Sequence, residues 1–256
     1  MTNKTSLSLL MKWSTTATAL LVVCLSFSSC KKDEKEDSSI RVVPRAFYNN
    51  EPLEIGALYT ENHGYKIRID GFKTYMSNVS LEDEDGNSYI IRGISLVDFD
   101  ESNSWEIELP QAKYTKLKYS IGVPESLNKD NDPAAYPTNH PLSVYGSAGM
   151  FWSWNSGYIF TKFEGKTNLD GEESPILDPF AFHVGEDFLY RAHEENISIC
   201  LGEDQRTIYL DFHTEQFLNS EQDNIDIAVD NVTHTAGNIP LAERFVANLN
   251  AAIEVN

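Results

Sequence analysis

Short runs in which apolar and polar residues alternate strictly recur along most of this chain, and they constrain its fold more than any other feature. The clearest run is Tyr65–Asp70, in which Tyr, Ile and Ile alternate with Lys, Arg and Asp. Because successive side chains of a β-strand point to opposite faces, such a run fits a strand with one buried face. The alternation therefore predicts strands at 65–70, 72–81, 88–92, 105–109, 115–121, 157–164, 178–185, 195–201 and 206–213.

Turn signals and a scarcity of helical periodicity complete the fold prediction. Asp85 and Gly86 form the centre of a turn between two of these strands, which predicts a hairpin. Only two helices are predicted, a short one at 125–127 and a longer one that begins near Pro240. The longer helix carries one apolar face, made of Leu241, Phe245, Leu249 and Ile253. Many short strands separated by turns predict a mainly β chain, with a single antiparallel β-sandwich domain over residues 40–256 and a C-terminal helix.

One long segment, residues 124–157, fits neither a strand nor a helix, because prolines and glycines interrupt it repeatedly. Loops of this length inside a compact domain are usually either functional or disordered. The segment is rich in aromatic residues, which argue against disorder. We therefore expect a long, ordered aromatic loop, and we look for a functional site there.

The amino terminus has the features of a lipoprotein signal peptide. Two lysines precede an apolar run at 17–27, which is too short to span a bilayer but suits a signal peptide. Two serines then lead directly into Cys30, as in a lipobox. Residues 1–29 are therefore predicted to be removed and Cys30 to carry a lipid that holds the protein to a membrane. An ordinary signal peptide cleaved nearby, which would leave Cys30 as a free thiol, is the alternative.

The segment after Cys30 is charged and polar. Residues 30–39 contain no apolar side chain beyond the cysteine, so they cannot bury surface and are predicted to be a disordered tether. Their acidic character resembles the signal that sends lipoproteins to the outer face of the outer membrane in Bacteroidetes-type bacteria. A merely solvated linker is the alternative. We expect an outer membrane lipoprotein that faces the periplasm or the cell surface.

Charge and cysteine content restrict what the protein can bind. The formal net charge is −19, and removal of residues 1–29, which hold two lysines and no acid, takes it to about −21. Such a surface repels nucleic acid and anionic lipid headgroups, and it attracts cations. Once Cys30 is lipidated, Cys200 is the one remaining cysteine, so no internal disulfide is expected. A metal site would then need histidine, carboxylate, thioether or an unusual ligand.

Five segments of the chain resemble segments of a known family, and they occur in the same order as in that family. The most specific is the block Met-x-Trp-x-Trp-x-x-Gly-Tyr-x-Phe at 150–160, with the Glu-Gly pair that follows it. The other four are at 75–81, 121–124, 140–143 and 182–185. With these segments the chain resembles the MbnP-like family, copper-binding proteins related to one encoded with methanobactin genes, and more distantly the MopE-like surface proteins of methanotrophs.

The resemblance implies a copper protein outside the cytoplasm. In characterised relatives a tryptophan is oxidised to kynurenine, which binds copper together with two histidines, and a haem-containing enzyme is the implied maturation partner. Intact indole offers only an N–H donor, whereas opening its ring exposes an aryl amine that can bind a metal. Imidazole nitrogens suit copper. The candidate metal ligands are His183, His140, Trp152 and Trp154.

Each candidate ligand also has a structural interpretation. Trp152 and Trp154 lie two residues apart on an extended chain, so both point to one face, and at least one is expected to pack in the core. For His183 the alternative is a hydrogen-bonded strand residue, and for His140 it is a residue that braces the loop. Among the other histidines, His213 is kept in reserve on its strand. The remaining three are assigned to a turn or to exposed polar surroundings: His63, His193 and His234.

These observations favour a lipid-anchored protein that stores, scavenges or transfers copper, and not an enzyme. No nucleophile elbow, phosphate loop or Cys-His nucleophile pattern appears in the sequence. The alternative function is that of a binding module whose aromatic loop contacts a glycan or a partner protein without any metal.

Overall fold

The computed structural model describes residues 37–129, 131–152, 157–170, 175–202 and 205–256. The predicted signal peptide, the lipidation site at Cys30 and Trp154 lie outside the described residues. Within the described ranges, no helix is both long enough and apolar enough to cross a membrane.

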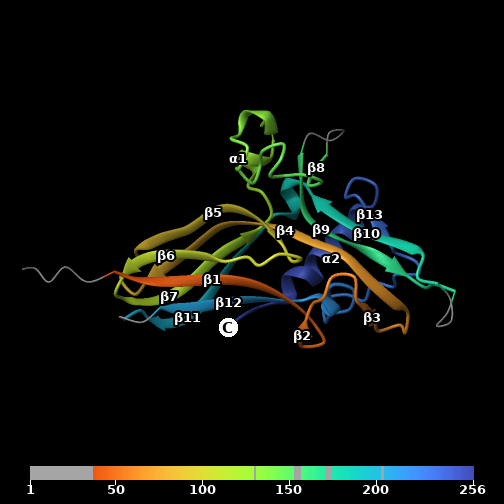
Figure 1. Cartoon of the computed structure of the whole chain (residues 1–256), viewed down its shortest axis with the longest axis horizontal. Helices are drawn as coiled ribbons and strands as arrows, with labels where there is room; N and C mark the ends of the chain where they lie inside the picture. Colours follow the sequence, from red (N-terminus) through yellow and green to blue (C-terminus); the bar gives the residue numbers. More distant parts are fainter. Residues whose placement is uncertain (1–36, 130, 153–156, 171–174, 203–204) are drawn as a thin grey trace, which may run out of the picture. The chain divides into compact units, whose positions relative to one another are not determined.

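The first of two sheets has the strand order β14–β12–β1–β2, with β6 also paired to β1 (Figure 1). Its strands are β1 (Asp37–Tyr48), β2 (Glu51–Pro52), β6 (Trp105–Pro110), β12 (Arg206–His213) and β14 (Ile253–Val255). β1 and β12 run parallel, with Ile40 opposite Arg206. This pair departs from the predicted antiparallel arrangement, because alternation is the same in parallel and antiparallel strands and does not determine strand direction.

The second sheet has the order β11–β7–β4–β9–β10–β13, with β3 and β5 also paired to β4 and β8 paired to β9. Its strands are β3 (Leu58–Thr60), β4 (Lys66–Asp83), β5 (Ser88–Asp98), β7 (Lys113–Ile121), β8 (Phe151–Trp152), β9 (Gly157–Thr167), β10 (Asp178–Gly185), β11 (Arg191–Cys200) and β13 (Val232–Thr233). β4 unites the two strands predicted at 65–70 and 72–81. The short strand β13 pairs with β10 in parallel.

The described residues also form five helical segments: α1 (Glu125–Asn128), α2 (Ile239–Ala251), and the 3-10 turns η1 (Pro133–Ala135), η2 (Asp187–Leu189) and η3 (Thr214–Phe217). The side chain of Asn238 caps α2 by accepting a hydrogen bond from the backbone N–H of Leu241 at 3.3 Å. The prediction that Ile253 continues this helix is wrong. The chain leaves the helix after Ala251, and Ile253 pairs with Phe212 at the edge of the first sheet.

The inward rows of both sheets and the apolar face of α2 share one core. The rings of Phe182 on β10 and Phe245 on α2 stack with centroids 4.7 Å apart. Further fully buried aromatic side chains come from both sheets and from η3: Phe72, Phe163, Phe180, Phe212 and Phe217. The predicted mainly β sandwich with a C-terminal helix is therefore confirmed.

The boundary of the predicted tether needs one correction. β1 begins at Asp37, which pairs with Pro110, so the last three residues placed in the tether belong to a strand. Strand pairing uses backbone groups, and polar side chains do not prevent it. Ser38 is buried, and its hydroxyl donates to the carbonyl of Gly202.

The described part of the long aromatic loop is ordered by a small core of its own. This core consists of Tyr75, Val123, Leu142, Met150, Trp152, Tyr158, Ile159 and Phe160. Two buried tyrosines tie the loop down: the hydroxyl of Tyr75 donates to the carbonyl of Pro141 at 3.0 Å, and that of Tyr158 donates to the carbonyl of Leu142 at 2.6 Å. In Figure 1 the loop with α1 lies at the top of the view, beyond the strands of the sheets.

Candidate metal centre

β10 presents His183 on the outer face of the second sheet. Along this strand Phe180, Phe182 and Val184 are buried, whereas the residues between them are partly exposed. The period of two therefore directs His183 away from the core. On the neighbouring strand β9 it lies opposite Lys162, whose side chain points to the same face.

β13 brings a second histidine to the same place. The parallel register pairs Phe182 of β10 with Thr233 of β13. The residues that follow them, His183 and His234, are therefore neighbours. Thr235 then adopts a left-handed conformation with φ of 57°. Its hydroxyl donates to the carbonyl of His183 at 3.3 Å and accepts from the N–H of Gly185 at 3.0 Å. These two bonds fasten the segment that carries His234 to the edge of β10.

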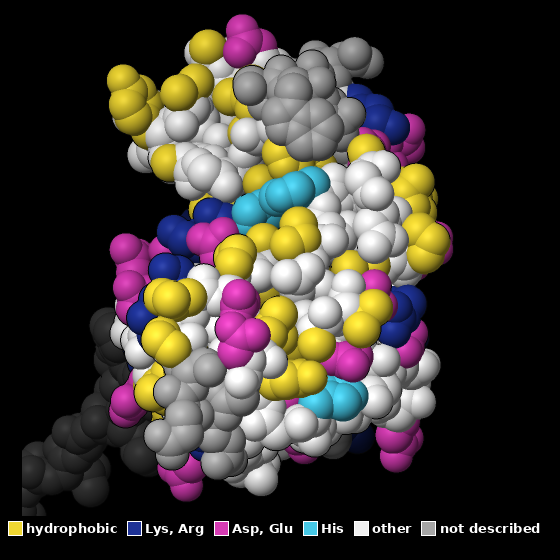
Figure 2. Space-filling view, turned by 90° about the vertical axis from the view of Figure 1, so that its right-hand side faces the viewer, with side chains coloured by type: hydrophobic (Ala, Val, Ile, Leu, Met, Phe, Trp, Pro, Cys, Tyr) yellow, Lys and Arg dark blue, Asp and Glu magenta, His cyan; other side chains and the backbone are white. Residues whose placement is uncertain are grey.

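The rings of His183 and His234 are in direct contact. Their centroids lie 4.8 Å apart with an interplanar angle of 62°. Only 15% of the His183 side chain is exposed, whereas His234 is exposed. Figure 2 shows a continuous, elongated histidine patch on this face, with basic and acidic side chains next to one end. The two imidazoles thus offer nitrogen donors at one point of the surface.

Glu164 is the charged neighbour of this pair. Its Oε2 lies 2.8 Å from Nε2 of His183, and its Oε1 lies 2.9 Å from Nζ of Lys162. Burial lowers the pKa of His183 below its usual value, and this effect outweighs the opposing effect of the hydrogen bond that His183 makes to Glu164. Burial raises the pKa of Glu164, but the hydrogen bonds from Lys162 and His183 together outweigh it, so that pKa is lowered. The site therefore combines a neutral imidazole with an ionised carboxylate at neutral pH.

Trp152 lies next to the histidine strand. It belongs to β8 and is 5% exposed. Its indole packs against Gly185, because a methyl group built there would come within 2.8 Å of Cζ3. Gly185 is two residues beyond His183, a spacing of roughly 7 Å along a strand. Trp152 is thus both part of the small core, as its structural interpretation predicts, and a neighbour of the candidate ligand His183.

The structure places His140 in the aromatic loop, with its ring stacked on Tyr136 at a centroid distance of 4.4 Å. Nδ1 accepts a hydrogen bond from the N–H of Leu142 at 3.1 Å. Both contacts match its structural interpretation as a residue that braces the loop. No contact in the described structure joins it to His183 or His234, and its role as a ligand stays a prediction.

The other histidines have separate surroundings. His193 is not simply exposed: its ring stacks on Tyr119 at 4.6 Å, and Nε2 lies 2.6 Å from Oδ1 of Asn250. His213 lies near Glu215 and Glu254, and His63 near Glu61.

Two residues of this site, His234 and Glu164, were not predicted from the sequence. The exposure of His234 was predicted correctly, but its contact with His183 was not, because β13 is only two residues long and leaves no periodic signal. Glu164 follows the two-tryptophan block in the sequence, yet its contact depends on the pairing of β9 with β10.

The donor set fits copper by ligand type. Imidazole is a good copper ligand, and Cys200, the cysteine within the described ranges, is an exposed residue of β11. The described residues bring together no group of three or more His, Cys, Asp or Glu that could hold a metal ion. The site thus offers two imidazoles, and the indole of Trp152 packs on Gly185, two residues beyond His183.

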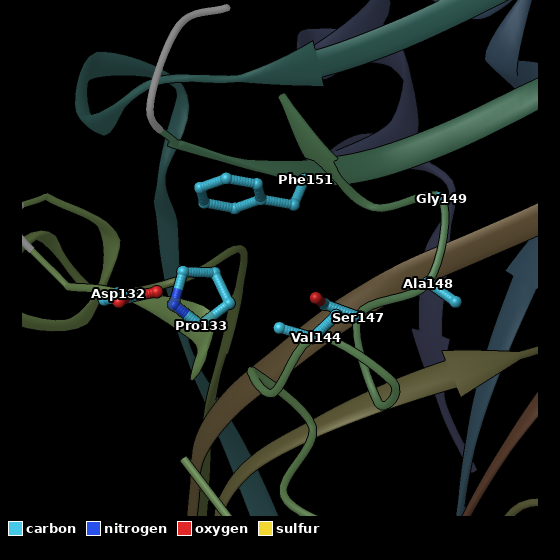
Figure 3. Close-up of a pocket in the computed structure, with 7 residues that line it drawn as sticks. All are labelled: Asp132, Pro133, Val144, Ser147, Ala148, Gly149 and Phe151. Carbon is cyan, nitrogen blue, oxygen red and sulfur yellow. The ribbon is translucent and has the colours of Figure 1, made fainter. Parts of the chain in front are cut away.

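A cavity of about 330 Å³ lies within the aromatic loop. Its lining residues are Asp132, Pro133, Val144, Ser147, Ala148, Gly149 and Phe151. Figure 3 shows the rings of Phe151 and Pro133 on opposite sides of it. This volume is at the lower end of the range for small-molecule sites.

Comparisons with known proteins identify the family. A family model described as MbnP matches residues 37–250. No curated protein matches the chain. Among solved structures, MbnP from Methylosinus trichosporium is similar with a TM-score of 0.46 and 14% sequence identity, over 74% of this chain and 80% of that chain. That similarity is too low to support a functional conclusion. The family model, however, covers most of the sequence, and this chain therefore belongs to the MbnP family.

Proposed function

We propose that this chain is a copper-binding protein that acts outside the cytoplasm, where it stores, scavenges or transfers the metal. A lipid on Cys30 would hold it to the outer membrane. The observation that carries the proposal is the contact between His183 and His234, whose ring centroids lie 4.8 Å apart at the outer face of β10. Membership of the MbnP family supports it through the copper chemistry that the sequence resemblance implies.

Two features of the protein support metal binding by the pair. Burial lowers the pKa of His183, so its ring is neutral at pH 7 and keeps a lone pair for coordination. The net charge of the chain is strongly negative, which raises the local concentration of cations. Oxidation of Trp152 to kynurenine by a haem-containing enzyme would place an aryl amine near His183, because the indole packs on Gly185.

Anaerobic titration with copper(I) against a competing chelator tests the proposal. Wild-type protein should show one strong site. His183→Ala and His234→Ala should each weaken it by more than about 100-fold, beyond the 10- to 100-fold loss typical of residues that only support a ligand. His193→Ala, which removes an imidazole stacked on Tyr119, is the matched control and should bind like wild type. Equal binding by all four proteins would exclude the pair.

His140→Ala should be titrated in the same series. Because the ring braces the loop, we expect this variant to retain the strong site. Loss of the site in this variant and in His183→Ala, but not in His234→Ala, would indicate that His140 and His183 bind the metal and that His234 does not.

A second candidate function rests on the cavity of the aromatic loop, where Phe151 and Pro133 form opposite walls. An apolar ring on each side is suited to stacking a sugar ring or an apolar side chain of a partner. If protein from the native host contains no copper, and Phe151→Ala abolishes binding to a glycan array while His234→Ala does not, this function replaces the first.

A further inference from the structure

Glu164 contacts His183 through a single ring nitrogen. Its Oε2 lies 2.8 Å from Nε2 of His183, while its Oε1 lies 2.9 Å from Nζ of Lys162. Each carboxylate oxygen therefore has a separate partner. The ion pair with Lys162 holds the carboxylate in its charged form next to the imidazole.

A charged carboxylate only accepts hydrogen bonds. The hydrogen shared with His183 must therefore belong to Nε2 of the imidazole. A neutral imidazole carries one N–H group and one lone pair, so a hydrogen on Nε2 leaves the lone pair on Nδ1. The contact with Glu164 thus selects which nitrogen of His183 is able to bind a metal.

The residues of β4 that lie opposite Glu164 and Lys162 do not compete for these contacts. An irregularity of β4 between Ile69 and Gly71 places Gly71 opposite Glu164. Gly71 has no side chain that could pair with the carboxylate. Oε1 of Glu164 lies 3.7 Å from the position that a Cβ atom would take on Gly71. Lys73, which lies opposite Lys162, is paired with Asp98 at 2.5 Å.

We infer that Glu164 is a positioning residue that holds His183 as the Nε2-protonated tautomer and thereby makes Nδ1 its metal-binding nitrogen. The metal-binding part of this inference rests on the proposed copper function. The tautomer is a property of the protein alone and can be measured without metal.

The first measurement is a long-range ¹H–¹⁵N spectrum of the whole chain, purified in detergent without metal and labelled at histidine nitrogen. In wild-type protein, His183 should show a protonated-type shift at Nε2 and an unprotonated-type shift at Nδ1. His183→Gln identifies its signals by their loss. Glu164→Gln leaves one acceptor oxygen, which Lys162 takes because its ammonium group can only donate, so the amide NH2 faces His183 and should shift the hydrogen to Nδ1. Glu164→Leu removes both groups and should give a mixture of both tautomers.

The second measurement is copper(I) affinity. Glu164→Leu should weaken binding by about 10- to 100-fold, the loss typical of removing the hydrogen-bond partner of a histidine ligand. Glu164→Gln should weaken binding to a similar or greater extent, because an amide NH2 facing Nε2 leaves the lone pair on Nε2 and not on Nδ1. Glu194→Leu is the control, because Glu194 is also an ion-paired carboxylate of the second sheet, with Lys116 at 2.7 Å, and it should have no effect. Thermal unfolding of all variants separates lost folding from lost positioning.

Two results would overturn the inference: protonation of His183 at Nδ1 in wild-type protein, or an unchanged tautomer and affinity in Glu164→Leu. Absence of copper(I) binding in wild-type protein would instead refute the proposed function. The spectra would still decide whether Glu164 selects the tautomer.

Discussion

The indole of Trp152 lies against the backbone of Gly185, so close that a methyl group on the glycine would come within 2.8 Å of Cζ3. This contact joins the small core under the aromatic loop to the outer end of β10. It places the first tryptophan of the Trp-x-Trp block beside the strand that carries His183. A methyl group at position 185 would also come within 2.4 Å of the carbonyl oxygen of Tyr158, so both contacts require a residue without a side chain there.

Gly185→Ala should therefore destabilise the fold and displace the indole. Overpacking of this kind costs about 1–3 kcal/mol, which for a domain of this size lowers the melting temperature by roughly 2–4 °C per kcal/mol. Calorimetry measures the change. Gly93→Ala is the control, because an added methyl group there meets no atom within 4 Å, and its melting temperature should stay near that of wild type. Equal stability of both variants would contradict the packing described here.

Covalent mass distinguishes the copper function from a simple binding module. A haem-containing enzyme that adds two oxygen atoms to tryptophan, followed by hydrolytic loss of formate, leaves kynurenine heavier by about 4 Da and with a free aryl amine. Peptide mapping of protein from the native host should place this increment on Trp152 or Trp154. Trp105, buried at the start of β6, is the internal control. An unmodified Trp152 and Trp154 in copper-loaded native protein would remove kynurenine from the site.

The stability of the metal-free protein should fall as the solution is acidified below pH 6.5. Burial lowers the pKa of His193 from its usual 6.5, more than the hydrogen bond with Asn250 raises it. Above pH 6.5 the ring is neutral in both states. At lower pH the unfolded chain takes up a proton first, and the free energy of unfolding decreases until the folded-state pKa is reached. His183 contributes with the same sign.

Thermal unfolding at pH 7.5, 6.5 and 5.5 measures this dependence. His193→Gln removes one titrating group, so its melting temperature should fall less between pH 7.5 and 5.5 than that of wild type. An identical slope in the variant would show that His193 titrates alike in the folded and unfolded chain.

The anchor prediction depends on Cys30. Cys30→Ser should release the protein into the soluble fraction and abolish labelling by a fatty-acid analogue, because serine cannot accept the thioether-linked lipid. Cell fractionation and metabolic labelling provide the two readouts. A serine variant that still fractionates with membranes through a lipid would refute the predicted anchor.

Much of the fold follows from local pattern. Strict alternation predicted most of the long strands, including Arg206–His213, because each inward row must be buried whatever strand lies beside it. The aromatic residues of the loop predicted order, and Tyr158 shows why: its buried hydroxyl holds the Leu142 carbonyl. The helical spacing up to Leu249 was also correct, and it failed at Ile253, where pairing with β12 replaces the helix.

The site itself was only partly predictable. The strand at 178–185 was predictable, and the alternation of His183 with Phe182 and Val184 is enough to direct its side chain away from the core. The position of His234 beside it depends on the pairing of β13 with β10, because the two residues are far apart in the chain and β13 has only two residues. The contact of Glu164 with His183 likewise depends on the pairing of β9 with β10. Alternation reports which way a side chain points, whereas the neighbours of that side chain depend on strand order, and strand order is a non-local property of the fold.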